Sequence, residues 1–141
     1  MAALSITWLG HSTFIITTPG GKRIVTDPWL EGNPKCPPDR KRIDAADVIL
    51  LTHGHSDHSG DVVSVSRATN APILAIHELS IWLEQKGLQN VQGMGIGGTV
   101  SEPAGPCRSG PRSLIPRSIG DSVPASLPPD GRRRPWGRRG S

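Results

Sequence analysis

The segment Thr52–His58 directly follows the apolar run Val48–Leu51 and holds three of the chain's five histidines together with a carboxylate. An apolar run of this length is typical of a strand covered on both faces, which predicts a central place in a sheet. Open α/β sheets bind ligands at the carboxyl ends of such strands. Imidazole nitrogens and carboxylate oxygens are the atoms that zinc and related divalent metals prefer as ligands. The sequence therefore predicts an α/β chain with a metal site where a buried strand ends.

The spacing within this segment divides the expected ligands into two pairs. His53 and His55 are two residues apart in a chain leaving a strand, so both can project to the same side and hold one ion. Asp57 and His58 follow on the first turn of a predicted helix and are expected to hold a second ion. The alternative is a polar loop with solvated histidines, but four ligand-type side chains at the end of a buried strand favour the metal site. We predict two divalent ions, zinc in the first instance and manganese as the alternative.

The run His53-Gly54-His55-Ser56-Asp57-His58 resembles the H-x-H-x-D-H signature of the metallo-β-lactamase superfamily. Two further stretches, Trp8–Phe14 and Asp27–Leu30, resemble the openings of a branch of predicted metal-dependent hydrolases that includes the ascorbate-6-phosphate lactonases. The resemblance covers roughly residues 4 to 100. It implies that residues 1–100 form the N-terminal half of an αββα sandwich.

The resemblance also implies a function, in which a metal-bound hydroxide attacks an ester, lactone or phosphoester in a small-molecule substrate. It implies that Asp57 orients the nucleophile as well as binding metal, and that Asp27 supports the site from just outside the metal shell. His11 lies in the predicted turn between the first two strands, where it is expected either to reach the substrate pocket or the surroundings of the metals, or to be solvated. Full-length members complete the site with a later histidine, an aspartate and a last histidine. Because no histidine follows His77, we expect this chain to be impaired.

Apolar periodicity and turn residues predict the remaining elements of residues 1–100. His77 is expected to start a helix and not to bind metal, and the glycine-rich stretch 94–99 is expected to be a turn. The expected strands are Leu4–Leu9, Thr13–Thr18, Arg23–Thr26, Val48–Leu51, Ile73–Ile76 and a strand from Val91, and the expected helices are 59–68 and 77–86, with a helical turn at Ile43–Ala46.

Residues 101–141 differ in composition from the first hundred. They contain eight prolines, eight arginines, no lysine and three acids, a net charge of +5 against −1 for residues 1–100. Such a segment buries too little apolar surface to offset its ordering entropy, so we predict disorder. The arginines around Trp136 could contact nucleic acid. The composition favours another interpretation, that this tail is read out of frame and the chain is a truncated or frameshifted product.

Other function classes stay open. One is a metal-binding or interaction module without turnover; another is a nucleic-acid processing nuclease, which the lack of excess positive charge in residues 1–100 disfavours. A homo-oligomer is also compatible with the sequence. The sequence has no apolar stretch of the ~20 residues that a membrane span needs and no signal peptide, so we expect a cytoplasmic protein. Cys36 is expected to be a reduced loop thiol, with a place beside a substrate channel as the alternative.

Overall fold

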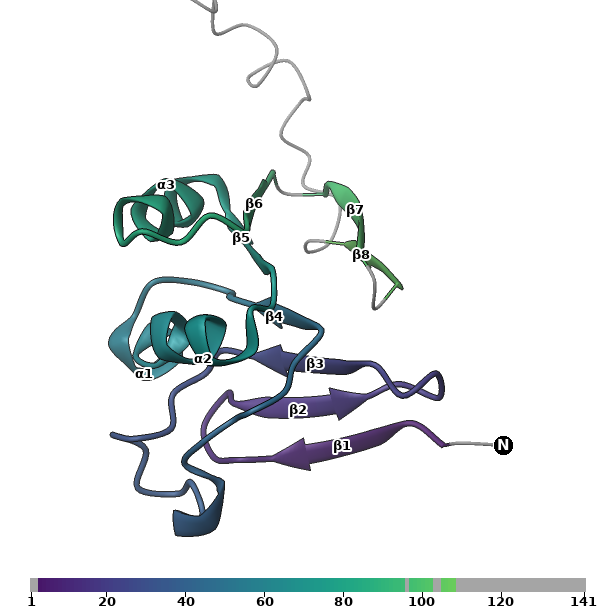
Figure 1. Ribbon diagram of the computed structural model, residues 1–141, viewed down its shortest axis with the longest axis vertical. Coiled ribbons are helices and arrows are strands. Elements are labelled where there is room, and N and C mark those ends of the chain that lie inside the picture. Colours follow the sequence, from purple (N-terminus) through teal and green to yellow (C-terminus); the bar gives the residue numbers. More distant parts are fainter. Residues whose placement is uncertain (1–2, 96, 103–104, 109–141) are drawn as a thin grey trace, which may run out of the picture.

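The computed structural model describes residues 3–95, 97–102 and 105–108. Its strands form one six-stranded sheet and one separate two-stranded hairpin, with short helices packed on the larger sheet (Figure 1). The elements, in chain order, are β1 (Ser5–Trp8), β2 (Phe14–Thr17), β3 (Arg23–Thr26), η1 (Pro38–Arg40), β4 (Val48–Leu50), α1 (Ser56–Ser59), α2 (Val62–Thr69), β5 (Ile73–Ile76), α3 (His77–Gln85), β6 (Val91–Met94), β7 (Thr99–Glu102) and β8 (Gly105–Arg108).

The strand order in the large sheet is the same as the order in the chain, from β1 to β6. The strands β1, β2 and β3 pair antiparallel as a meander, whereas β3, β4, β5 and β6 pair parallel. Parallel neighbours need crossover connections. The segment that contains η1 connects β3 to β4, α1 and α2 connect β4 to β5, and α3 connects β5 to β6. This mixed sheet confirms the predicted α/β class and the central place of β4.

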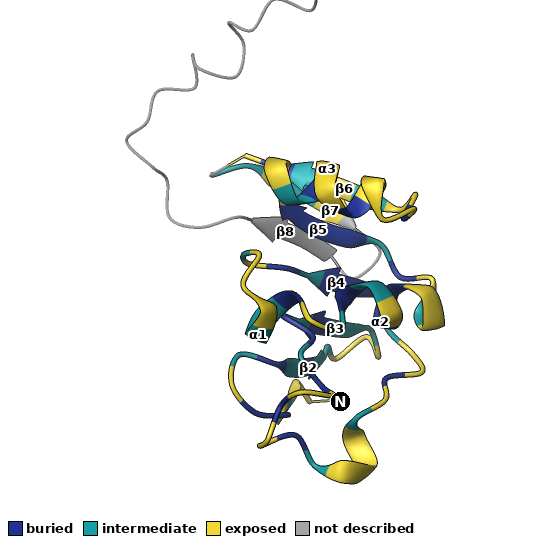
Figure 2. Ribbon diagram, turned by 90° about the vertical axis from the view of Figure 1, so that its left-hand side faces the viewer, coloured by how far each residue is buried: buried dark blue, intermediate teal, exposed yellow. Residues whose placement is uncertain are grey.

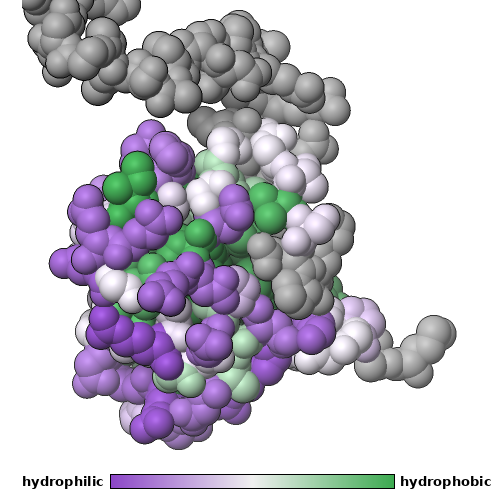
Figure 3. Space-filling model, turned by 45° about the horizontal axis from the view of Figure 1, so that its top comes forward, coloured by the Kyte–Doolittle hydropathy of each residue, from purple (hydrophilic) through white to green (hydrophobic). Residues whose placement is uncertain are grey.

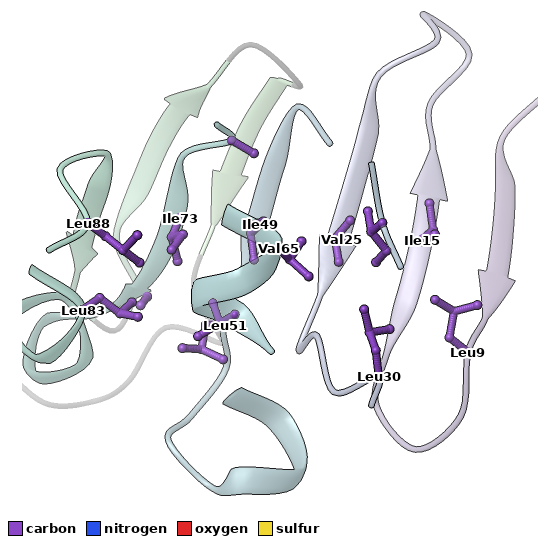
Figure 4. Packing of buried hydrophobic residues seen from close by; sticks show 14 of the residues in the cluster. Leu9, Ile15, Val25, Leu30, Ile49, Leu51, Val65, Ile73, Leu83 and Leu88 are labelled. Carbon is purple, nitrogen blue, oxygen red and sulfur yellow. The ribbon is translucent and has the colours of Figure 1, made fainter. Parts of the chain in front are cut away.

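One face of the sheet packs against the helices and forms the main core. Side chains from alternate strand positions, such as Ile15, Val25 and Ile49, are almost fully buried there. In the same cluster, Val65 of α2 lies beside Ile49, and Leu83 of α3 lies near Ile73 and Leu88, as Figure 4 shows. Figure 2 shows the same division by burial, with dark blue central strands and yellow outer helix surfaces. Removal of this apolar surface from water is the main stabilising term for a fold of this kind.

The opposite face of the sheet is also apolar but is covered less completely. Val48, Leu74 and Met94 form a second buried cluster, and Val100 of β7 packs against it. Farther along the same face, Ile6 and Trp8 of β1 stay about 60% exposed, at 60% and 58%. They pair with Ile16 and Phe14, so they lie on the face that continues through Ile24 to Val48. Cross-strand partners share a face.

The predicted helix 59–68 is two helices, separated at Gly60 and Asp61. Asp61 is held by the loop that follows β3: its carboxylate accepts from the backbone N–H of Leu30 at 2.6 Å and of Glu31 at 3.1 Å. Its own N–H donates to the carbonyl oxygen of Pro28 at 2.9 Å. These contacts fix Asp61 outside helical geometry. The helical turn predicted at Ile43–Ala46 is wrong as well, since those residues have no regular structure.

The segment 31–42 is irregular, apart from the short η1 turn. Cys36 within it is buried in the main core, and this burial raises the pKa of its thiol. A buried thiol with a raised pKa is inert, because the thiolate is the reactive form. Cys36 is therefore a packing residue and does not line a channel.

Strand structure continues past the boundary predicted at residue 100. The strands β7 and β8 pair antiparallel, with Val100 opposite Cys107. Val100 packs on the second apolar cluster, and this packing stabilises β7. The polar residues next to Val100 gave no indication of a strand here. Residues 109–141, which make up most of the predicted disordered tail, lie outside the described residues. Within the described part of the chain, no helix has the length and apolar character that crossing a membrane requires.

Candidate metal centre

Three segments distant in sequence meet at one edge of the sheet. The turn between β1 and β2 carries His11, the end of β3 carries Asp27, and the end of β4 leads into the segment Thr52–His58. Because β3 and β4 are parallel and β2 is antiparallel to β3, the start of β2 lies at the edge where β3 and β4 end. The topology therefore places these groups together, at the edge that open sheets use for ligand sites.

The four predicted ligands converge there. Nε2 of His53 lies 3.1 Å from Nδ1 of His55, and the ring of His53 lies over that of His58 with centroids 3.9 Å apart. Asp57 and His58 lie on α1, and each contacts His11: the Nε2 atom of His11 is 3.1 Å from Nε2 of His58 and 3.2 Å from Oδ2 of Asp57. The rings form a continuous row from His55 to His11.

The side chain of Asp27 is hydrogen-bonded to this row of rings. Its side chain is buried, and its Oδ2 atom accepts from Nδ1 of His58 at 2.9 Å and from the hydroxyl of Thr52 at 2.8 Å. Its Oδ1 atom accepts from the backbone N–H of Thr52 at 2.8 Å. The Thr52 hydroxyl also lies 2.9 Å from Nδ1 of His53. One carboxylate thus anchors two histidines, one directly and one through a hydroxyl.

These contacts fix the tautomers of both histidines. An ionised carboxylate only accepts hydrogen bonds, so His58 must carry its proton on Nδ1. The Thr52 hydroxyl has one proton, which goes to Asp27, so the hydroxyl accepts from Nδ1–H of His53. In both rings Nε2 then carries the lone pair, which faces a neighbouring histidine: Nδ1 of His55 in the case of His53, and Nε2 of His11 in the case of His58. Carboxylate partners orient metal-binding histidines in the same way.

The donor set fits a divalent ion. Zinc–nitrogen distances of 2.0–2.1 Å put neighbouring ligand atoms of a tetrahedral site about 3.3 Å apart. The contacts of 3.1 and 3.2 Å in this cluster are close to that value. His11, Asp57 and His58 each offer one ligand atom, all within 4.8 Å of one another.

His11 is the residue whose position the sequence left open. The structure places it against Asp57 and His58, with 42% of its side chain exposed to solvent. Its contacts span 47 residues of sequence, and the only signal for them was its place in the Trp8–Phe14 stretch. His77 starts α3, as predicted, and is not one of the residues in the three-membered group.

An apolar pocket borders the histidine segment. It has a volume of about 420 Å³ and is lined by Gly54, Ile76, Leu79 and Trp82, with Glu78 as the polar group. Gly54 lies between the two histidines His53 and His55, so this pocket adjoins the row of rings. A larger pocket of about 520 Å³ lies between α2 and the loop that contains η1. None of the site residues His11, Asp27, His53, His55, Asp57 and His58 lines it. Figure 3 shows apolar surface mainly in the upper half of the molecule, where Figure 1 places α3 and β6.

Fold and site together define an α/β protein with a histidine–aspartate centre at the ends of parallel strands. Residues 5–101 match the family model described as beta-lactamase superfamily domain. A UPF0173 metal-dependent hydrolase from Koribacter versatilis is 46% identical over 99 residues, which cover 70% of this chain and 42% of that relative. One from Methanobrevibacter smithii is 45% identical over 96 residues, covering 68% and 39%.

Among solved structures, Igni18, described as a novel metallo hydrolase from the hyperthermophilic archaeon Ignicoccus hospitalis, is 36% identical with a TM-score of 0.60. The match covers 69% of this chain and 42% of Igni18. The chain belongs to the beta-lactamase superfamily, in the branch of its UPF0173 relatives, which confirms the resemblance noted in the sequence. It spans about two-fifths of the length of the relatives it matches.

Proposed function

We propose that this chain carries the metal-binding part of a metal-dependent hydrolase that acts on an ester, lactone or phosphoester of a small molecule. The observation that carries this proposal is the convergence of His53, His55, Asp57 and His58 at one edge of the sheet, with the buried Asp27 orienting two of the imidazoles. The names of the relatives, which are metal-dependent hydrolases, support the reaction class.

His53 and His55 would hold one divalent ion, and Asp57 and His58 a second, with zinc or manganese as the metals. When bound, such ions lower the pKa of coordinated water to about 7 and polarise the bond to be broken. The residues of the chain contribute orientation: Asp27 and Thr52 keep both Nε2 lone pairs toward the site. Asp57 has a second carboxylate oxygen besides Oδ2, and this oxygen can accept a proton or hydrogen bond from the attacking water.

The pocket beside Gly54 supports a substrate with an apolar part. Its walls are the side chains of Ile76, Leu79 and Trp82, and the mouth carries the carboxylate of Glu78. A pocket of this size is in the range that small ligands occupy. The apolar group of an ester or lactone placed here would bring the scissile bond toward His53 and His55.

The test is hydrolysis by the purified full chain after loading with Zn²⁺ or Mn²⁺, with an aryl ester, a lactone and a phosphodiester as probes. Activity on at least one probe should disappear on chelation and return with metal. Asp57→Asn should lower the rate at least 100-fold, as expected for loss of a group that handles the proton. Asp44→Asn is the matched control, because Asp44 is exposed and distant from the site. Activity that survives chelation, or that survives in Asp57→Asn, would overturn the proposal.

A second candidate is a metal-binding module without turnover. It is favoured by one observation: within the described residues, His53 and His55 form a pair and not a group of three ligand-type side chains. Catalytic zinc usually has three protein ligands. Metal binding without hydrolysis of any of the three probes would select this candidate.

A further inference from the structure

We propose that His11 is the third protein ligand of the ion at Asp57 and His58, so that this chain alone holds one divalent ion with three side chains and a second ion more weakly. The inference rests on the metal dependence in the proposed function. It changes the expected division of ligands from two and two to three and two. The group lies within the described residues and needs no residue from elsewhere.

The distances from Nε2 of His11 to Asp57 and His58 support a shared ion. Nε2 of His11 is 3.1 Å from Nε2 of His58 and 3.2 Å from Oδ2 of Asp57. A tetrahedral ion about 2.0–2.1 Å from each ligand atom requires separations of about 3.3 Å, and both separations from His11 are close to this value. The three residues each offer a ligand atom within 4.8 Å of the other two. His58 already turns its Nε2 lone pair toward this point, because Asp27 holds the Nδ1 proton.

The backbone conformation at His11 also supports a role as ligand. His11 has a φ of +51° and follows Gly10 with a φ of +101°. A non-glycine residue in the left-handed region carries strain, and such strain concentrates at functional sites. A Cβ at Gly10 would meet Cβ of Lys35 at 2.7 Å, so this turn has no room for a larger residue there. The strained turn is what brings the His11 ring over α1.

The His11 ring and its peptide are also held in place. The ring packs edge-on against Trp29, with centroids 5.7 Å apart, and against His58 at 4.8 Å. The indole N–H of Trp8 donates to the carbonyl oxygen of His11 at 2.9 Å. A solvated turn histidine needs none of these contacts. They are the kind of support that pre-orients a ligand before the metal arrives.

Unequal ligand numbers predict stepwise loading. The ion at His11, Asp57 and His58 has three protein ligands, the number found in catalytic zinc sites, whereas the ion at His53 and His55 has two. The first equivalent of metal should therefore bind at the His11 side. The second should bind more weakly.

The experiment is a titration of the metal-free full chain with Zn²⁺ by calorimetry and with Co²⁺ by visible absorption. The variants are His11→Asn, His53→Asn, His58→Asn and, as a matched control, His77→Asn. Asparagine is chosen because it tolerates positive φ, which preserves the turn at position 11. Circular dichroism checks that each variant is folded.

We expect His11→Asn to weaken binding of the first ion at least tenfold and to change the Co²⁺ spectrum. His53→Asn should leave the first ion and abolish the second, and His77→Asn should bind as the wild type. A first-ion affinity in His11→Asn within threefold of the wild type, with His58→Asn defective, would overturn the inference and leave the proposed function intact. If the wild type binds neither Zn²⁺ nor Co²⁺, the inference and the proposed metal dependence both fail.

Discussion

Replacing Asp27 by asparagine would exchange a carboxylate, whose two oxygens both accept hydrogen bonds, for an amide with one acceptor oxygen and one NH₂ donor group. The Oδ2 atom of Asp27 accepts from the Thr52 hydroxyl and from Nδ1–H of His58, and Oδ1 accepts from the Thr52 backbone N–H. In either orientation of the asparagine amide, its NH₂ group faces a donor that the carboxylate satisfied. Where the NH₂ group replaces Oδ2, the conflict is relieved if the protons of His53 and His58 move from Nδ1 to Nε2. Where it replaces Oδ1, it opposes the backbone N–H of Thr52, and that donor is left without an acceptor.

The magnitude follows from these contacts. Hydrogen bonds to a charged group contribute about 1.5–3 kcal/mol each, and a buried donor left without an acceptor costs about 1–3 kcal/mol. With one bond weakened and one lost, we expect Asp27→Asn to lower the free energy of unfolding by about 2–4 kcal/mol. Moving a proton to Nε2 blocks the atom that faces the metal. Loss of such a supporting carboxylate typically lowers metal affinity 10–100-fold.

The assay combines urea denaturation of the metal-free chain with Zn²⁺ calorimetry on Asp27→Asn and on the control Asp44→Asn. Asp44 has a side chain that is 71% exposed and contacts the exposed Arg42, so its replacement should change the free energy of unfolding by less than about 0.5 kcal/mol. The reasoning would be refuted by an Asp27→Asn protein that unfolds like this control and binds the first Zn²⁺ with wild-type affinity.

Two other perturbations test the two ends of the sheet: Asp47 lies where β3 and β4 begin, and Gly10 lies in the turn that carries His11. The backbone N–H of Arg23 donates to the Asp47 carboxylate and lowers its pKa below the ordinary 3.8. The stability that Asp47 contributes is therefore present above pH 3.8, and it disappears as the pH falls through the lower pKa of the folded state. Denaturation of wild type and Asp47→Asn between pH 7 and pH 2 should show a difference below about 1 kcal/mol at neutral pH that shrinks to zero in acid; a difference that grows in acid would contradict this. Gly10→Ala should cost about 2 kcal/mol or more in the same assay, because of its positive φ and the contact with Lys35, whereas Gly20→Ala, whose added Cβ meets nothing closer than 3.8 Å, should cost far less.

Much of the fold follows from local patterns in the sequence. The alternation in β1, the turn after Thr18 and the unbroken apolar run of β4 each have a local cause, and the structure has all of them where expected. The break between α1 and α2 has no local cause. It depends on a hydrogen bond between Asp61 and the backbone N–H of Leu30, 31 residues away in sequence. Neither the apolar periodicity nor the helix propensity of the segment indicates this contact.

The candidate site divides in the same way. The segment from His53 to His58 is contiguous, so the proximity of its side chains could be predicted from spacing alone. The contact of His11 with His58 spans 47 residues and depends on two successive positive φ angles, which the sequence indicates only through Gly10. The link from Asp27 through Thr52 to His53 is likewise a tertiary feature, although the strand-end position of Asp27 indicated its supporting role.

The exposed sheet face at β1 carries a tryptophan, Trp8, that can serve as a fluorescence reporter. Trp8 lies on that face with 58% of its surface in water, so in the isolated chain its indole fluorescence should be red-shifted and readily quenched by iodide. Any sheet, helix or second molecule that settles on this face must cover the indole and shift its emission to shorter wavelength. Because Trp29, Trp82 and Trp136 also fluoresce, a Trp8→Phe variant would assign the signal of Trp8 and would make covering of the face measurable without a label.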